Sequence, residues 1–455
     1  QGGFYLIIRQ GLGLLIGIGG MVALTRIIGP QSYGIYASAL GISIFLSKVA
    51  GLGLNTYLIR KERNLEKDYF DQAFTLLILN GLIVSFFGII LSPFLEKWLG
   101  NSAIRFPFII MILTLPLNSI IFTTMAKLER NLNYRAVATI ELIGQLAYYT
   151  VSLPIGYMIG GVIPPIIGYW TQQLVLVIAG IITSKYKPKF KWSSPMAKEM
   201  VSYGIGFSSS MWIWQMRDLV NPIIVGRYAG ADAVGYIALA IRIVDALSFV
   251  KQATWRLSIT ALAKLQGDIL KLQKAVNEGM SLQVLALSPF LIGFALISHW
   301  VIPVVFGDKW MLVLEIFPFI AVSYLVNSIF NMHSSVLYVK KLNLDVTLFH
   351  ITHIILLVGG AFFLVPLVGI YGYGLAEIIA IFSYSVIHRK LTKILVLDYS
   401  SVFPWVIAFI PLLFTTMVGY EWMIILSIPL IVVISIPRNR NQILNYRNQL
   451  LWRAK

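Results

Sequence analysis

Six charged side chains lie within two adjacent apolar segments between positions 208 and 251. Their neighbours are mostly Trp, Ile, Val, Ala and Phe. The six are Arg217, Asp218, Arg227, Arg242, Asp245 and Lys251. A charge at the middle of a bilayer costs roughly 3 kcal/mol or more, so such side chains usually face a bundle interior or a water-filled cavity. Four bases and two acids in so short a stretch predict a polar, mainly cationic cavity.

The acids and bases of this stretch differ in how they can pair. Arg242 and Asp245 are three residues apart and share a helix face. Either they form a self-neutralising structural pair, or Arg242 binds substrate and the Asp245 carboxylate tunes it. Arg217 and Asp218 are adjacent and point in different directions, so they do not simply cancel each other. Arg227, at a helix end, is expected to anchor or cap rather than to bind.

Two more basic side chains lie inside apolar segments nearer the N-terminus. Lys48 is expected midway along the second segment, too deep to reach the surface easily. Arg9 lies about a turn and a half into the first segment, where snorkelling to the surface is the alternative to a site role. With Arg217, Arg242 and Lys251 they complete the predicted set of anion-binding residues.

The composition indicates that these residues lie on membrane-spanning helices. Of the 455 residues, 58% are hydrophobic and 12% are charged, whereas soluble proteins have about 45–50% and about 25%. Apolar runs of about twenty residues, the length that crosses a bilayer as a helix, follow one another with short polar breaks. The chain has no cysteine, which excludes disulfides and thiolate metal sites.

We predict an all-α polytopic membrane protein with about fourteen spans. The chain begins at Gln1, almost inside the first apolar segment and without a signal peptide, so we expect a short N-terminal piece to precede it. The predicted spans are 4–28, 33–59, 73–95, 104–126, 137–159, 162–184, 201–226, 233–256, 279–303, 311–338, 346–366, 369–388, 402–419 and 422–437.

The net charge of +17 is explained by topology rather than by nucleic acid binding. Most lysines and arginines fall in alternate loops, and short basic loops stay cytoplasmic. This bias predicts an even number of spans with both termini in the cytoplasm. The longest basic loop, Leu257 to Asn277, alternates apolar and basic residues and predicts a surface-lying amphipathic helix, with a solvated linker as the alternative.

An internal repeat divides the predicted spans. The turn Arg26-Ile-Ile-Gly29-Pro-Gln-Ser-Tyr-Gly34 recurs as Arg227-Tyr-Ala-Gly230-Ala-Asp-Ala-Val-Gly235. Further on, Phe106-Pro-Phe-Ile recurs as Phe317-Pro-Phe-Ile. The sequence thus predicts two parallel six-helix lobes, 1–199 and 200–400, followed by 401–455 with spans 13 and 14 and a basic cytoplasmic tail. Transporters with such repeats bind substrate between the lobes and alternate access by rocking them.

These turns also resemble a known family. Together with Leu128-Glu-Arg-Asn-Leu-Asn-Tyr-Arg135 and Phe306-Gly-Asp-Lys-Trp310, they are similar to the polysaccharide exporters of the multidrug/oligosaccharidyl-lipid/polysaccharide (MOP) superfamily, most closely the Wzx-type flippases. The resemblance implies a V-shaped bundle around a cationic cavity, and translocation of an undecaprenyl-pyrophosphate-linked oligosaccharide across the bacterial inner membrane for surface polysaccharide biosynthesis. It also implies contact with membrane lipids and leaves open contact with other polysaccharide assembly proteins.

The resemblance implies no resident cofactor and leaves open coupling to H+ or Na+. Asp218 falls where this family often carries an Asp in its seventh span, so Asp218 and Asp245 are the candidate coupling or gating residues. No metal site is expected, because His350 and His353 lack a third ligand nearby. Glu141 and Glu315 are expected to be structural, and Glu377 is left open.

Three other functions are weighed against the flippase. A drug or cation antiporter of the same superfamily favours acidic residues in its cavity, whereas here basic groups dominate. A membrane glycosyltransferase or polymerase needs a catalytic carboxylate or His on a sizeable outer loop, and every outer loop here is short, so we expect no enzyme. A peptidoglycan-precursor flippase would differ only in its cargo.

Overall fold

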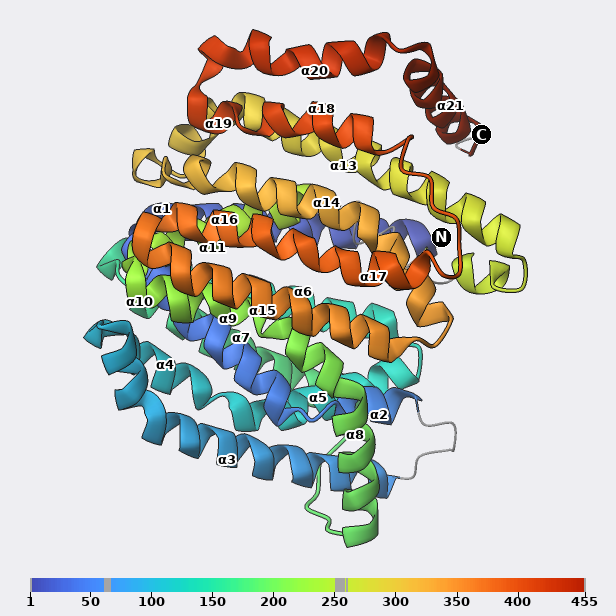
Figure 1. Ribbon diagram of the computed structural model, residues 1–455. Helices are drawn as coiled ribbons and strands as arrows, with labels where there is room; N and C mark the ends of the chain where they lie inside the picture. The colour runs from blue at the N-terminus through green and yellow to red at the C-terminus, as the bar shows by residue number, and fades with distance from the viewer. Residues whose placement is uncertain (1, 61–66, 250–257, 259–260, 454–455) are drawn as a thin grey trace. The chain divides into compact units, whose positions relative to one another are not determined.

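The computed structural model describes residues 2–60, 67–249, 258 and 261–453, without the side chains of 2–12, 14, 207, 445 and 447–453. The described residues form helices and contain no β-strand, as the predicted all-α class requires (Figure 1). They divide into two compact units, Gln1–Gly235 and Tyr236–Lys455. The predicted lobes 1–199, 200–400 and 401–455 stay a prediction.

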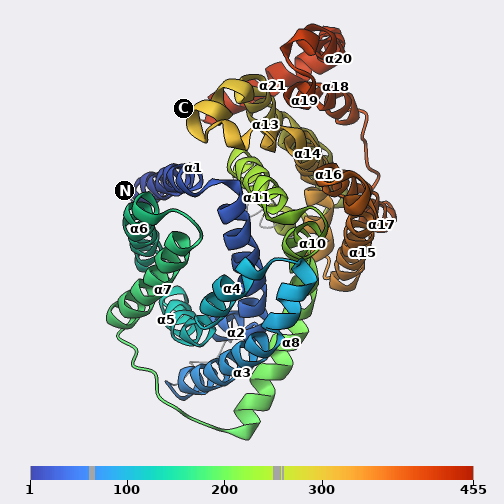
Figure 2. The same ribbon diagram turned by 90° about the vertical axis from the view of Figure 1, so that its left-hand side faces the viewer.

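Helix α1 (Gly2–Ala50) contains two predicted spans joined across a sharp bend, which Figure 2 shows clearly. Gly29 lies at the bend with φ 75° and ψ 172°, a conformation that favours glycine, and Pro30 follows it without a backbone donor. Before the bend, Gly20 of α1 lies against the Tyr149 ring of α6 (Tyr134–Ile159). After it, α1 packs against α3 (Lys67–Leu99) and α4 (Arg105–Ile112).

The two copies of the repeated turn press directly on each other in unit 1. A Cβ atom on Gly34 would lie 1.8 Å from the Ala231 carbonyl oxygen, and one on Gly235 would lie 2.3 Å from the Pro30 carbonyl oxygen. Gly29 and Gly230, which correspond in the repeat, both have positive φ, 75° and 85°. The repeat glycines therefore serve two needs, a left-handed turn and a contact between backbones that no side chain permits.

The rest of unit 1 follows the predicted spans closely. α3 packs on α4 and α5, and α6 packs on α7, as Figure 1 shows for neighbouring ribbons. The seventh predicted span is broken into four pieces at its outer half, including a π-helical turn, η3. The remaining elements of the unit are α2 (Leu54–Arg60), η1 (Ser102–Ile104), η2 (Leu115–Leu117), α5 (Asn118–Arg130), α7 (Ile163–Ser184), α8 (Ser194–Gln215), α9 (Arg217–Val220), η3 (Asn221–Val225) and α10 (Gly226–Tyr228).

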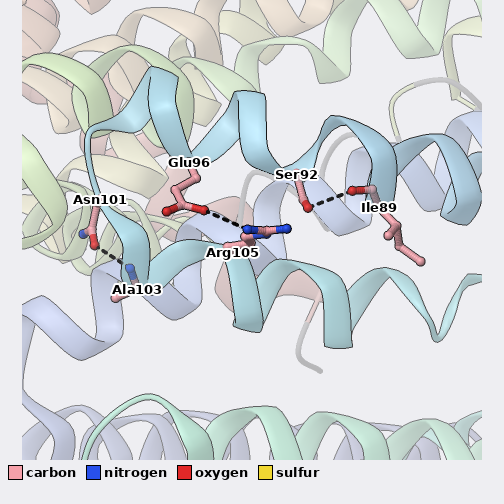
Figure 3. Close-up of polar contacts among 6 residues, drawn as sticks. All are labelled: Ile89, Ser92, Glu96, Asn101, Ala103 and Arg105. Carbon is pink, nitrogen blue, oxygen red and sulfur yellow. Dashed lines mark hydrogen bonds and ion pairs between the residues drawn. The ribbon is translucent and has the colours of Figure 1, made fainter.

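The turn between α3 and α4 is closed by polar contacts (Figure 3). The Asn101 side chain accepts a hydrogen bond from the Ala103 N–H (3.0 Å) and caps η1. Arg105 forms an ion pair with Glu96 across the turn, with 3.6 Å between Nη1 and Oε2. One of the few basic residues of the loops predicted to face outward is thus held locally by a carboxylate.

Unit 2 is also built of packed helices, and the chain passes into it within α11 (Gly230–Leu247). α14 packs against α13, α16 and α18, and α15 packs against α16 and α17. α20 packs on α18, so the last two predicted spans are attached to this unit. Its further elements are α13 (Ile269–Val305), η4 (Asp308–Trp310), α14 (Val313–Val339), α15 (Asn343–Val368), α16 (Ile370–Ala380), η5 (Ile381–Ser383), α17 (Tyr384–Leu391), α18 (Phe403–Leu413), α19 (Thr415–Val418), η6 (Tyr420–Trp422), α20 (Met423–Ser435) and α21 (Pro437–Arg453).

Within the described residues, nine helices are long and apolar enough to cross a membrane, or up to ten if the bent pair Tyr420–Ser435 and Pro437–Leu444 counts as one span. The protein is therefore a multi-pass membrane protein. The count falls below fourteen because α1 merges two predicted spans, because spans 7 and 13 form shorter or more polar helices, and because span 14 enters only as the bent pair. Predicted span 8 lies partly outside the described residues. Fourteen spans stay a prediction.

The long basic loop is not one surface helix. Residues 266–268 break the helix, and Asp268 caps α13 by accepting the Lys271 N–H (3.0 Å). This hydrogen bond lowers the pKa of the Asp268 carboxyl below its ordinary value. Residues 269–277, predicted as part of the amphipathic helix, are instead the first turns of α13, because a capping aspartate starts a new helix there. Residues 250–257 and 259–260 lie outside the described residues.

We expect Gly34→Ala to destabilise the protein, because the added methyl group overlaps the Ala231 carbonyl. Forced overpacking of this kind lowers the free energy of unfolding by about 1–3 kcal/mol. The measurement is the fraction of monodisperse protein that survives heating in detergent. Gly206→Ala is the matched control, since no heavy atom lies within 4 Å of its Cβ position. Equal survival of both variants would show that the two turns do not hold each other.

Candidate functional site

The predicted site residues of unit 1 lie where helices are interrupted. α1 ends at Ala50, and a turn through Leu52 (φ 47°) and Gly53 (φ 65°) leads into α2. Lys48 therefore occupies the last turn of α1 rather than the middle of an unbroken span, and its side chain is exposed. The negative end of the helix dipole favours a cation there. The break follows from the glycines, which allow the chain to turn within the apolar segment.

Arg217 and Asp218 lie at the second interruption. α8 ends at Gln215, α9 covers Arg217–Val220, and η3 follows as a π-helical turn. Such turns frequently occur at functional sites because they reorient side chains. The Arg217 guanidinium lies 5.8 Å from the centre of the Trp214 ring, a cation–π distance, and Asp218 is exposed.

The structure brings these two interruptions together. The Trp212 indole N–H donates to the Lys48 carbonyl oxygen (3.1 Å), so α8 is tied to the end of α1. Helix α9, which carries Arg217 and Asp218, also packs against α1. Lys48, Arg217 and Asp218 thus form one charged junction, defined here as the α1–α8–α9 junction. Sequence reasoning selected its three charges but missed Trp212, whose partner is a backbone atom.

Arg242 and Asp245 belong to unit 2 and lie on α11. The Tyr324 hydroxyl of α14 donates to an Asp245 carboxylate oxygen (2.7 Å), so Asp245 has a hydrogen-bond partner on another helix. The Arg242 side chain is exposed, as a binding role requires. A cavity shared by Lys48, Arg217 and Arg242 stays a prediction, because these residues belong to different units.

Two predicted residues lie outside the described part of the chain. Lys251 falls in 250–257, and the side chain of Arg9 is likewise outside the described residues, although its backbone belongs to α1. Both stay predictions.

Three other charged residues of the spans have local partners. Glu377 is fully buried and accepts hydrogen bonds from Ser323 (2.9 Å) and Tyr373 (3.0 Å). Glu315 accepts one from the Tyr371 hydroxyl (2.7 Å). The Arg227 guanidinium lies 5.7 Å from the Trp98 ring centre, which agrees with an anchoring role. These contacts assign Glu315, Glu377 and Arg227 to the scaffold.

Three histidines of unit 2 contact hydroxyl groups. His353 Nδ1 lies 3.0 Å from Ser383 Oγ, and in the described part of the chain no three His, Cys, Asp or Glu residues cluster as a metal site would require. His333 and His388 both contact the Tyr399 hydroxyl at 2.7 Å. Burial raises the pKa of Tyr399, so this hydroxyl stays a neutral donor. Sequence reasoning missed this cluster because its members are far apart in the chain.

An apolar groove of about 580 Å³ runs along unit 1 beside the second half of α1. Its walls come from α1, α3, α4 and η3, and include Leu46, Phe87, Trp98 and Ile223. The Trp98 N–H is satisfied by the Ile223 carbonyl oxygen (3.1 Å), so the tryptophan presents only its ring to the groove. Such a lining accepts hydrocarbon and offers nothing to a polar group.

Comparison with known proteins identifies the family. A family model described as "Polysaccharide biosynthesis protein" matches residues 23–315, well over half of the chain. The chain belongs to this family. A "Lipopolysaccharide biosynthesis protein WzxC" of Escherichia coli is 25% identical over 340 residues, which cover 72% of this chain and 67% of the relative. An "Uncharacterized membrane protein in cps region" of Klebsiella pneumoniae is 23% identical, covering 88% of this chain and 84% of the relative.

Solved structures show the same fold. The "Lipid II flippase MurJ" in an inward closed conformation matches 98% of this chain and all of its own with a TM-score of 0.76 at 13% identity. A multidrug resistance MATE transporter of the MOP superfamily, facing inward, matches 85% of this chain and 98% of its own with a TM-score of 0.63 at 15% identity. The predicted MOP fold and the resemblance to Wzx-type proteins are confirmed.

This chain is therefore a multi-pass membrane protein of the polysaccharide biosynthesis family, and it has the fold of the flippase and transporter structures that it matches. The charged junction and the apolar groove are the two features of unit 1 on which a functional proposal can be built. One can hold a charged headgroup, and the other can hold a hydrocarbon chain.

We expect Lys48 and Asp218 to be energetically coupled. Lys48→Gln and Asp218→Asn each leave one charge without its neighbour, so the double variant should lose less stability than the two single losses combined. Charges in contact show interaction energies of roughly 0.5–3 kcal/mol, measurable by denaturant titration of the purified protein. Glu96→Gln is the control partner, because Glu96 pairs with Arg105 and should add independently to Lys48→Gln. Additivity in both cycles would contradict the junction.

Proposed function

We propose that this chain translocates an undecaprenyl-pyrophosphate-linked oligosaccharide from the inner to the outer leaflet of the bacterial cytoplasmic membrane for surface polysaccharide biosynthesis. Arg217, Arg242, Lys48, Lys251 and Arg9 bind the pyrophosphate-sugar headgroup. Two lobes rock around this cationic cavity so that access alternates between the two leaflets.

The observation that carries the proposal is the placement of Lys48, Arg217 and Asp218 at two helix interruptions that lie against each other. Discontinuous helices mark the substrate sites of many transporters, because broken backbone is tolerated at membrane depth only where it lines a cavity or is covered by protein. A pyrophosphate needs cations to replace its hydration, and an arginine fork matches its oxygens. The Trp214 ring beneath Arg217 orients that fork.

The apolar groove beside α1 supports a lipid-linked cargo. It begins on the half of α1 that carries Lys48, and its lining includes Leu46 and Val49 on either side of that lysine in sequence. A polyprenyl chain in the groove leaves its headgroup near the charged junction. Both the membrane interior and the groove are apolar, so a lipid chain that enters the groove keeps apolar surroundings.

Asp218 and Asp245 couple or gate the movement. Asp218 is exposed beside Lys48, so a proton or a sodium ion bound to it changes the charge of the junction. Asp245 is hydrogen-bonded to Tyr324, which links its charge state to the packing of α11 on α14. No other cofactor enters the proposal.

The orientation of the chain follows from its loops. We place both termini in the cytoplasm of a bacterial cell, since the basic residues gather in alternate short loops. Membrane lipids, and other proteins that assemble polysaccharide, are its partners there.

We expect Arg217→Gln and Arg242→Gln each to reduce the rate of flipping at least roughly tenfold, because each variant loses one charge-assisted hydrogen bond to phosphate. The measurement is the appearance of a fluorescent undecaprenyl-pyrophosphate oligosaccharide in the outer leaflet of proteoliposomes. Arg217→Lys should retain part of the activity, because it keeps the charge and loses the fork.

Arg105→Gln is the control, because Arg105 pairs with Glu96 in an outer turn and should leave transport unchanged. Full activity of the Arg217 and Arg242 variants would overturn the proposed binding role. Uptake of a cationic drug without lipid movement would assign the chain to the antiporters, and faster movement of a peptidoglycan precursor would reassign its cargo.

A further inference from the structure

Four lysines surround one cavity at the end of unit 1 that carries its basic loops. The cavity has a volume of about 410 Å³ and is lined by Lys67, Phe70, Lys127, Lys185, Tyr186 and Lys187. The lysines come from three separate parts of the chain. Lys67 begins α3, Lys127 lies in the last turn of α5, and Lys185 and Lys187 follow the end of α7. The name four-lysine pocket is used for it below.

The wall of the four-lysine pocket is rigid around Tyr186. This side chain is 2% exposed and donates its hydroxyl to Asp71 Oδ1 (2.7 Å), while its ring packs on Phe70. Burial, reinforced by this hydrogen bond, raises the pKa of Tyr186, so the phenol stays neutral. Asp71 also accepts the Lys189 N–H (3.1 Å). The buried carboxylate nearest to Tyr186 is thus engaged by neutral donors and does not line the pocket.

The four positive charges have no carboxylate partner among the described residues. Lys191 in the same loop is paired with Asp68, and Lys390 of unit 2 is paired with Asp345 at 2.8 Å. Among the lysines of the pocket, Lys127 contacts the Tyr186 ring, 5.5 Å from Nζ to the ring centre. Like charges gathered on one concave surface raise the local concentration of anions.

We propose that the four-lysine pocket binds a phosphate-bearing headgroup. A group with two or more negative charges satisfies several lysines at once, and the aromatic wall of Phe70 and Tyr186 covers the carbon atoms next to the phosphate. Basic pockets between helices on the cytoplasmic side of membrane proteins bind headgroups in this way.

Two sources offer this chemistry. One is an anionic phospholipid of the surrounding leaflet. The other is the pyrophosphate of the cargo before it reaches the charged junction, and only this second source rests on the proposed function. Binding at the pocket does not require transport, since the charges and the cavity are present in the folded chain.

The test uses the purified full chain and two probes. Isothermal titration with inorganic pyrophosphate in detergent reports the diphosphate, and native mass spectrometry with phosphatidylglycerol against phosphatidylethanolamine reports the phospholipid. Lys185→Gln/Lys187→Gln should weaken binding of the relevant probe by about fivefold for each lysine removed. All four lysines lie at the surface, and heat stability confirms that the variant is folded.

Lys189→Gln/Lys198→Gln is the matched control. It removes the same charge from the same part of the chain, and neither side chain lines the pocket. If only the pocket variant loses affinity for pyrophosphate, the ligand is a diphosphate. If only the pocket variant loses affinity for phosphatidylglycerol, the ligand is a lipid headgroup. Equal affinity of the pocket and control variants for both probes, or no saturable binding to the unaltered protein, would overturn the proposal. Because the assay contains no transport step, this failure is distinct from loss of flipping.

Discussion

The contact between the two repeated turns is the constraint on which unit 1 depends. Gly34 and Gly235 bring the backbones of α1 and α11 closer than any side chain permits. A second close approach joins the same parts of the unit, since a Cβ on Gly204 of α8 would lie 1.9 Å from the Leu52 carbonyl oxygen. These contacts hold the broken seventh segment against the second half of α1. The charged junction is a consequence, because Lys48 and Asp218 lie between them along the chain.

Buried acids and exposed charges have different surroundings in this protein. Glu377 is buried and bound by two hydroxyl groups, and Asp245 is held by one. These acids are compensated by neutral donors, which satisfy a carboxylate without introducing an opposite charge. Lys48 and Asp218 are exposed, at helix interruptions. The proposed transport cycle uses both kinds of charge, because it needs fixed acids within the helix packing and accessible charges that exchange one partner for another.

The basic residues of the loops have two roles that the sequence does not separate. Their distribution between alternate loops predicts the orientation of the chain, and this distribution is a property of the linear sequence alone. In the four-lysine pocket, folding adds a second property, since the start of α3, the end of α5 and the segment after α7 bring four of these charges to one cavity. Residues predicted to orient the chain can therefore also line the proposed binding pocket.

The sequence by itself determined the fold class and most of the helix bounds, because burial in lipid demands apolar runs of a given length and the chain shows them plainly. Its repeated turns and their order were enough to indicate the family, which the match to residues 23–315 confirmed. It also selected Lys48, Arg217 and Asp218, since charges are rare in apolar segments and each one stands out.

Only the tertiary structure decided where helices break and what the charges meet. Gly29 joins two predicted spans in one bent helix, and the turn at Leu52 places Lys48 at a helix end, because a glycine-containing segment can continue, bend or stop according to its neighbours. The partners Trp212, Tyr324 and Tyr399 lie far along the chain from the groups they bind, and no local pattern records such contacts. Side-chain types and spacing are local properties, whereas pairing depends on the path of the whole chain.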